Sequence, residues 1–478
     1  MNESYENIVK ILESNLSDYA MKSFDSKTFV DGGELFTFYN KIWTKESEKL
    51  KTRTPIQHQK DKILYSNGIR KQAEKYHVLF KGGQRIIRNY ITHTMRMMQV
   101  SRTICRTLKL NEDFAEGIVL GTKIGALPFI HASKNTVSKW IEKTISDLDK
   151  AETKNTKLDL TDPDYLPDYP SWFRNLKSEK IINQVKQFIP YASGKNVNNT
   201  YSSGKQGYWL LTTNPYTVES ISNSFCPELM FGIWRHSLNS PFGEKSFNHK
   251  QKVNNALSEY HEITWHDITF ESIVVQYADD ITWVLENLND ADTATLLHDQ
   301  NSKGLFRELY LQGNFEQPLL IQGLNKKDTG KLYSYFINDF ISNSLETLSK
   351  KDGIESKMLL KEGKKDVLIG LSREGLEVLQ IFKNFLNDRV FSENRVSHRK
   401  KMLETITDGC CDLIYNGKND YVRKYISTKA NIEGWSDEQK ENSLNLLDND
   451  IHRIQVTVNV ISELSDQEIF SFVGMESF

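Results

Sequence analysis

The sequence predicts an all-α protein, because apolar residues recur at helical spacing in its clearest segments. Residues 89–110 and 270–290 both carry apolar side chains three and four positions apart, which places them on one helix face. From Lys331 onward the chain is rich in Leu, Ile and charged residues and has few of the alternating runs that strands require. A multi-helix fold with a helical C-terminal region is therefore expected.

Individual elements follow in order along the chain. Helices are expected over 89–110, over 112–124, where the segment is more apolar and should be buried, and over 270–290. Residues 150–172 concentrate Asp, Thr and Pro and are expected to form a loop. Residues 192–207 are rich in Gly, Ser and Asn, which predicts a mobile loop on the ligand side. Residues 205–213 suit a short strand.

Composition excludes several classes of protein. The 61 basic and 63 acidic residues give a net charge of −2, so no overall electrostatic attraction to nucleic acid is expected. These totals do not exclude a local basic groove. The four cysteines form no Cys-x-x-Cys pair, which argues against a zinc site or a disulfide framework. Neither a signal peptide nor an apolar run long enough to span a membrane is found. A soluble, cytoplasmic protein is expected.

Three segments carry the strongest functional pattern. His93 stands near the start of the 89–110 helix, Gly121-Thr-Lys-Ile-Gly-Ala-Leu-Pro-Phe-Ile-His131 begins in the last turn of the second helix, and Ala278-Asp279-Asp280-Ile281 lies in the third. Helices distant in sequence can bring such side chains together inside a bundle. The common phosphate-loop and hydrolase motifs, including Walker A, G-x-S-x-G and H-E-x-x-H, do not occur.

In this order the segments resemble those of the dGTP triphosphohydrolase family of the HD superfamily. The resemblance covers roughly residues 53–470 and includes four further segments: Asp61-Lys-Ile63 with Ser66 and Arg70, Lys75-Tyr-His-Val78, Pro227 to His236, and Asn459 to Asp466. Each motif is weak alone, and their order and spacing make the resemblance fairly specific.

The resemblance implies an HD-domain fold and a reaction that releases the whole triphosphate from a deoxynucleotide. It also implies a divalent metal such as Mg, Mn or Fe, which the family holds with a His, a His-Asp pair and a distant Asp. His93 and Asp279 match the first and last of these ligands, and His131 matches a catalytic histidine. Phosphate contacts are expected from the basic residues on matched segments, namely Arg53, Arg70, Lys75 and Arg88.

The central metal pair does not match, because Thr122 and Lys123 stand where the family has His and Asp. Nearby, Ala126 replaces a histidine, Ile130 a glycine and Lys134 a glutamate, and two substrate-contacting positions further away carry Ala73 and Trp209. The exchange of a carboxylate for an ammonium strongly opposes metal binding, since a unit charge pair a few ångströms apart is worth roughly 4 kcal/mol at an effective dielectric near 20. No metal cofactor is therefore expected.

Three interpretations of this departure stay open. In the first, the pocket is packed shut and the chain is an oligomeric scaffold. In the second, Lys123 pairs with Asp279 and acts as a fixed cation that meets a triphosphate. In the third, another metal site was built and the remodelled site still hydrolyses deoxynucleotides. His266-Asp267 and His298-Asp299 are the dipeptides that such a site could use, but both lack the context of the family motif.

We favour a deoxynucleoside triphosphate sensor or regulatory subunit with little or no catalysis. The family also implies a symmetric homo-oligomer, often a hexamer, or an assembly with an active homologue. By the same resemblance we divide the chain into an N-terminal helical segment (1–50), a nucleotide-binding core (51–310) and a helical C-terminal region (311–478).

Overall fold

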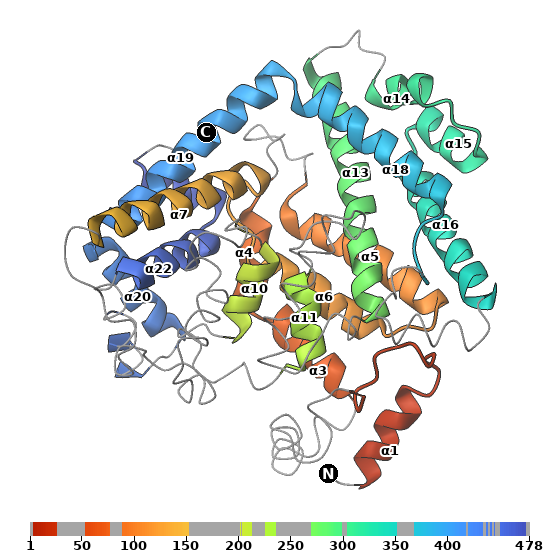
Figure 1. Ribbon diagram of the computed structural model, residues 1–478, viewed down its shortest axis with the longest axis horizontal. Helices are drawn as coiled ribbons and strands as arrows, with labels where there is room; N and C mark the ends of the chain where they lie inside the picture. The colour runs from red at the N-terminus through yellow and green to blue at the C-terminus, as the bar shows by residue number, and fades with distance from the viewer. Residues whose placement is uncertain are drawn as a thin grey trace. The chain divides into compact units, whose positions relative to one another are not determined.

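The computed structural model of the chain describes residues 3–25, 53–76, 88–152, 201, 203–212, 225–235, 269–298, 304–350, 368–416, 419–433, 436–437, 440–441, 444 and 450–474. Within these ranges the regular structure is helical and no β-sheet forms, which confirms the all-α prediction (Figure 1). The helices expected over 89–110, 112–124 and 270–290 are all present.

The chain divides into two compact units that alternate along the sequence. Unit 1 comprises Met1–Ala73, Leu79–Leu120 and Phe225–Arg399, and unit 2 comprises Glu74–Val78, Gly121–Ser224 and Lys400–Phe478. The domain limits at residues 50 and 310 come from the family resemblance and not from contacts in the structure, and they stay a prediction.

Unit 1 holds most of the described helices. Those that lie wholly within it are α1 (Glu3–Leu12), α3 (Pro55–Leu64), α4 (Asn67–Lys71), α5 (Tyr90–Thr107), α11 (Pro227–Arg235), α13 (Phe270–His298), α14 (Leu305–Gly313), α15 (Pro318–Lys326), α16 (Thr329–Lys350), α18 (Arg373–Leu386) and the π-helical turn η7 (Asn387–Phe391).

Unit 2 contains five complete described helices and parts of three other elements. The complete helices are α7 (His131–Glu152), α10 (Ser203–Thr212), α20 (Asn419–Glu433), α22 (Asp450–Glu463) and α23 (Asp466–Phe472). The elements with residues in both units are η1 (Gln72–Glu74), α6 (Glu112–Ile124) and α19 (Asn394–Asn416).

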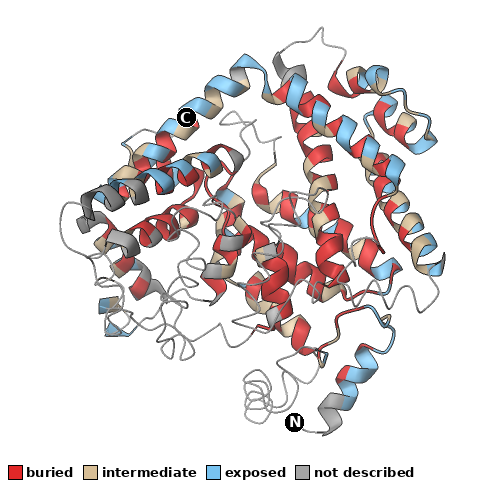
Figure 2. Ribbon diagram, viewed as in Figure 1, coloured by how far each residue is buried: buried red, intermediate tan, exposed pale blue. Residues whose placement is uncertain are grey.

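Helix α13 is the centre of unit 1. It runs beside α5, and α16 and α18 also pack against it (Figure 1). Most of its described side chains are buried, whereas α14, α15, α16 and α18 alternate buried and exposed faces (Figure 2). Aromatic contacts extend this core from Tyr277 to Phe340 and from Phe336 to Phe382. A helix buried on nearly all sides is expected at the middle of a large helical unit.

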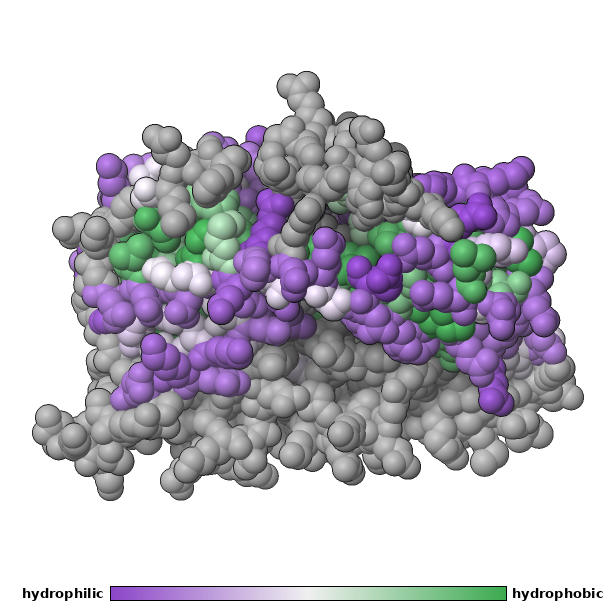
Figure 3. Space-filling model, turned by 90° about the horizontal axis from the view of Figure 1, so that it is seen from above, coloured by the Kyte–Doolittle hydropathy of each residue, from purple (hydrophilic) through white to green (hydrophobic). Residues whose placement is uncertain are grey.

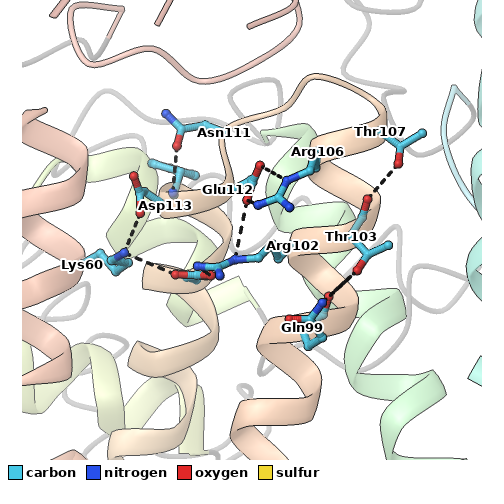
Figure 4. Close-up of polar contacts among 11 residues, drawn as sticks. Lys60, Gln99, Arg102, Thr103, Arg106, Thr107, Asn111, Glu112 and Asp113 are labelled. Atoms are coloured by element: carbon cyan, nitrogen blue, oxygen red, sulfur yellow. Dashed lines mark hydrogen bonds and ion pairs between the residues drawn. The ribbon is translucent and has the colours of Figure 1, made fainter. Parts of the chain in front are cut away.

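A charge network joins α3, α5 and the start of α6 (Figure 4). Arg102 and Lys60 both reach the carboxylate of Glu116, which is almost fully buried, and the Lys60 ammonium also lies 2.5 Å from Asp113. Arg106 binds Glu112 at the exposed edge. These acidic residues lie in the first turns of α6, where the helix dipole favours negative charge.

Asn111 begins α6 and ties it to the rest of unit 1. Its side-chain oxygen accepts the backbone N–H of Phe114, as an N-cap residue does. The Asn111 amide nitrogen donates to the carbonyl of Met21, and the Asn111 backbone N–H donates to Glu271 on α13. The start of α6 is therefore fixed by three independent hydrogen bonds.

In unit 2 the last turn of α6 lies in close backbone contact with α10. A Cβ at Gly207 would stand 2.2 Å from the carbonyl oxygen of Gly121, and a Cβ at Gly125 would stand 2.4 Å from that of Ser203. Only glycine permits this approach. Two sequence expectations are corrected here: residues 205–212 are helical and form no strand, and residues 203–207 belong to α10 and not to a loop.

The other expected loops fall mostly on residues that are not described. Residues 150–152 are the end of α7, while 153–172, 192–200 and 202 lie outside the described ranges. Short apolar runs with aromatic residues are ambiguous between strand and helix when read by periodicity alone. That ambiguity explains the incorrect strand at 205–213.

The described residues on the face shown in Figure 3 are mostly hydrophilic, with separate apolar areas between them. Exposed large apolar side chains occur on several described helices, among them Leu311, Leu319, Leu345, Ile381 and Met402. Among the described helices, none is both long and apolar enough to cross a membrane.

Candidate functional site

Three carboxylates of α13 occupy one face of that helix in unit 1. Asp279, Glu286 and Asp290 are separated by about two turns and then by about one more, a spacing that aligns side chains on a helix. All three meet basic or imidazole groups from the N-terminal half of α5 or from Arg88, two residues before it. The two helices are thus joined by a row of polar contacts.

Arg88 makes the most buried of these contacts, with only 7% of its side chain exposed. Its Nε lies 2.7 Å from Asp290 Oδ2, and its NH1 lies 3.3 Å from Glu286 Oε2. Glu286 also binds the partly exposed Arg96 and accepts a 3.1 Å hydrogen bond from the Tyr333 hydroxyl. Two arginines and one tyrosine therefore share two buried carboxylates.

Burial dominates the electrostatics of this cluster. Loss of water raises the pKa of Asp290 to about 6, although the guanidinium of Arg88 acts in the opposite direction. Burial likewise raises the pKa of Tyr333, so its hydroxyl keeps its proton and acts as a donor to Glu286.

His93 lies between this cluster and Asp279. One ring nitrogen, Nδ1, is 3.1 Å from Arg88 NH1, and the other, Nε2, is 3.5 Å from Asp279 Oδ1. The ring stacks on Tyr90 at 5.7 Å between centroids. Asn89 caps α5 through the Thr92 N–H and donates to the carbonyl of Ala73, which fixes the first turn that carries His93.

In unit 2 the last turn of α6 presents Thr122 and Lys123. Thr122 is fully buried and Lys123 is 3% exposed. The following loop holds Phe129 and Ile130 at φ values of 55° and 46°, a region that a β-branched residue rarely adopts. Ile130 stands where the family resemblance places glycine, so the backbone turn expected of glycine persists with a larger residue.

Lys75 and Asp466 hold this loop in place. The fully buried Lys75 ammonium donates to the carbonyl oxygens of Ala126 and Ser462. The Asp466 carboxylate accepts the Phe129 N–H with one oxygen and the Tyr76 N–H with the other, both at 2.8 Å. Gln206 of α10 joins the same group by donating to Asn459. Segments predicted from separate family motifs therefore meet in unit 2.

The other predicted phosphate ligands occupy different surroundings. Arg53 is partly exposed and pairs with Asp61 at 3.0 Å, and Arg70 is exposed on α4. Arg88 and Lys75 are buried among protein groups, so in this arrangement they contact protein and their proposed contact with phosphate stays a prediction. His131 opens α7 and Trp209 lies in α10, and the side chains of both fall outside the described part.

The donors do not fit the metal that the family resemblance implies. Within the described ranges, no three or more His, Cys, Asp and Glu side chains are grouped so as to hold an ion. His93 and Asp279 approach each other. Lys123, which stands where the family resemblance expects a carboxylate, is buried. Stable sites generally need three or four suitable ligands. His266-Asp267 and Asp299 lie outside the described residues.

Sequence reasoning missed Glu286 and Asp290. The helix that contains both residues was predicted from the spacing of its apolar side chains, and neither of the two residues belongs to a family motif. A signal did exist, because their spacing from Asp279 places three acidic residues on one face of a largely apolar helix. Such a row needs basic partners when it is buried.

Comparison with known proteins supports the same family. No family model matches the chain. Among curated proteins it is similar to deoxyguanosinetriphosphate triphosphohydrolase-like proteins of Caldanaerobacter subterraneus (31% identity; 30% of this chain and 41% of the relative), Clostridium tetani (23%; 52% and 49%) and Wolinella succinogenes (21%; 73% and 79%). The first two matches span less than half of the relative's length. The chain thus resembles dGTP triphosphohydrolase-like proteins.

Proposed function

We propose that this chain binds deoxynucleoside triphosphates on a dGTP triphosphohydrolase-like scaffold and has lost most or all of the metal-dependent hydrolysis. It would act as a sensor or a regulatory subunit in the cytoplasm. The choice of a deoxynucleoside triphosphate as the ligand rests on the names of the similar proteins, which are deoxyguanosinetriphosphate triphosphohydrolase-like. The loss of catalysis comes from this chain's own residues.

The observation that carries the proposal is the burial of Lys123 on the last turn of α6. At the position where the family resemblance gives a metal-binding carboxylate, the chain has an ammonium. A fixed cation repels a divalent ion and attracts a polyphosphate, so the same substitution argues against the metal and for retained phosphate binding. The suggested ion pair between Lys123 and Asp279 stays part of the proposal.

Thermal unfolding with each deoxynucleoside triphosphate, in the presence and absence of a chelator, tests binding. A ligand at a hundredfold excess over its dissociation constant stabilises the folded state by about 2.7 kcal/mol. We expect a shift in Tm that the chelator does not change. Lys123→Ala should abolish the shift, whereas Lys139→Ala, which removes an exposed lysine of the same unit, should keep it.

Release of inorganic triphosphate tests the enzyme alternative, which the names of the similar proteins favour. Robust hydrolysis that is lost in both His93→Ala and Asp279→Ala would replace our proposal with an active hydrolase that has a remodelled site. No thermal shift with any of the nucleotides, together with no hydrolysis, would instead favour a scaffold without a nucleotide site.

Self-association is the assembly that we propose, as a homo-oligomer such as a hexamer or with an active homologue. Light scattering on the purified chain at several concentrations measures the mass directly. A monomer at all concentrations would contradict the homo-oligomer and leave only the mixed assembly, which co-purification with an active homologue would test.

A further inference from the structure

The contact between Arg88 and His93 decides where the imidazole carries its hydrogen. A guanidinium has five N–H donors and no acceptor. His93 Nδ1, 3.1 Å from Arg88 NH1, must therefore accept the hydrogen bond through its lone pair. In a neutral ring the single N–H is then on Nε2, the nitrogen that faces Asp279 Oδ1 at 3.5 Å.

Arg88 is held firmly enough to impose this choice. Its side chain is 7% exposed, its Nε binds Asp290 at 2.7 Å, and NH1 also lies 3.3 Å from Glu286. Because NH1 has two hydrogens, it can serve Glu286 and His93 together. Tyr90 stacks on the imidazole and restricts rotation of the ring about its own axis.

We propose that Arg88 is a positioning residue that fixes His93 in the Nε2–H tautomer, so that the ring donates to Asp279 and does not offer Nε2 to a metal ion. The two side chains that resemble the ends of a metal site then form a hydrogen-bonded pair instead. All the residues in this proposal belong to unit 1, so it does not depend on Thr122 or Lys123.

The arrangement is the reverse of what a metal-binding histidine needs. Such a histidine uses the lone pair of one nitrogen for the ion and donates the N–H of the other to a carboxylate or a carbonyl. Here the nitrogen away from Asp279 faces a donor, so the lone pair is used there. Replacing Arg88 with an acceptor would permit the opposite tautomer and free Nε2.

The tautomer can be read directly from the chain labelled with ¹⁵N-histidine. Long-range ¹H–¹⁵N spectra at pH 7.5 distinguish protonated from unprotonated ring nitrogens, and His93→Gln identifies the signals of this residue. We expect a protonated Nε2 and an unprotonated Nδ1. An Nδ1–H tautomer, or an imidazolium with both nitrogens protonated, would overturn the proposal, and this measurement needs only folded wild-type protein.

Two variants test whether Arg88 is the cause. In Arg88→Gln the side-chain carbonyl can accept from Nδ1–H, so we expect a shift toward that tautomer. Arg96→Gln is the matched control, since it removes the other arginine bound to Glu286. Identical His93 spectra in Arg88→Gln and Arg96→Gln would contradict the assigned role.

Binding of Mn²⁺, followed by electron paramagnetic resonance without nucleotide, gives a second readout. We expect Arg88→Gln to bind Mn²⁺ at least tenfold more tightly than the wild type, and we expect Arg96→Gln to equal the wild type. Equal weak binding by all three would contradict the claim that the tautomer limits metal affinity. Because no nucleotide is present, failure here is distinguishable from failure of the proposed nucleotide binding.

Discussion

The ammonium of Lys75 donates a 2.6 Å hydrogen bond to the backbone carbonyl of Ser462, which lies at the end of α22 far along the chain. The same ammonium reaches the carbonyl of Ala126. A buried lysine thus joins a short N-terminal segment, the loop after α6 and the C-terminal helices into one unit.

Replacing Lys75 with methionine should destabilise unit 2 by about 2–4 kcal/mol, because two buried carbonyl oxygens lose their donor. Urea unfolding measures the change. Lys139→Met, on an exposed position of α7, should alter the free energy of unfolding by less than about 0.5 kcal/mol. Equal effects of the two variants would show that Lys75 has no special structural role.

Asp466→Asn should cost about 1–3 kcal/mol. The carboxylate uses one oxygen for the Phe129 N–H and the other for the Tyr76 N–H, and an amide can accept only one of these bonds. Chemical denaturation compared with Asp408→Asn, the same change at an exposed position of α19, isolates this effect. An unchanged midpoint in Asp466→Asn would contradict the paired-acceptor role.

The network in Figure 4 predicts a contrast between two glutamates of α6. The Glu116 side chain is only 3% exposed and binds Lys60 and Arg102, so Glu116→Gln should cost roughly 3 kcal/mol by removing the buried negative charge that both cations share. Glu112 is more exposed, and Glu112→Gln should cost less than about 1 kcal/mol. Thermal and urea unfolding of the two variants provide the comparison, and a reversed order would refute it.

The raised pKa of Asp290 predicts that the stability of the folded chain depends on pH. Burial raises its pKa from 3.8 to about 6 in the folded chain, so between about pH 4 and pH 6 the folded state binds more protons than the unfolded state. The free energy of unfolding should therefore fall as the pH rises through this window, by on the order of 2–3 kcal/mol from this group.

Urea unfolding of Asp290→Asn across the same window measures that contribution by difference, since the asparagine oxygen still accepts from Arg88 but does not titrate. Asp388→Asn, at an exposed position of η7, is the control and should keep the wild-type pH profile. Parallel profiles for the wild type and Asp290→Asn would show that the carboxyl titrates alike in the folded and unfolded states.

The sequence alone determined the helical class and the principal helices of unit 1. The apolar period over 89–110 became α5, and that over 270–290 became the longer α13, because a helix that buries one face must repeat apolar residues at its own period. The motifs also led correctly to the family resemblance, and to His93 and Asp279 as neighbours.

The tertiary structure decided what the partners of these residues are. Periodicity cannot show that Arg88 is buried against Glu286 and Asp290, or that Lys75 binds two backbone carbonyls, because these contacts join positions far apart in sequence. It also placed the helix at residues 203–212, α10, against the end of α6, where Gly125 and Gly207 permit the close backbone approach. Local sequence fixes helix formation, whereas the neighbours of a buried charge depend on how the helices pack.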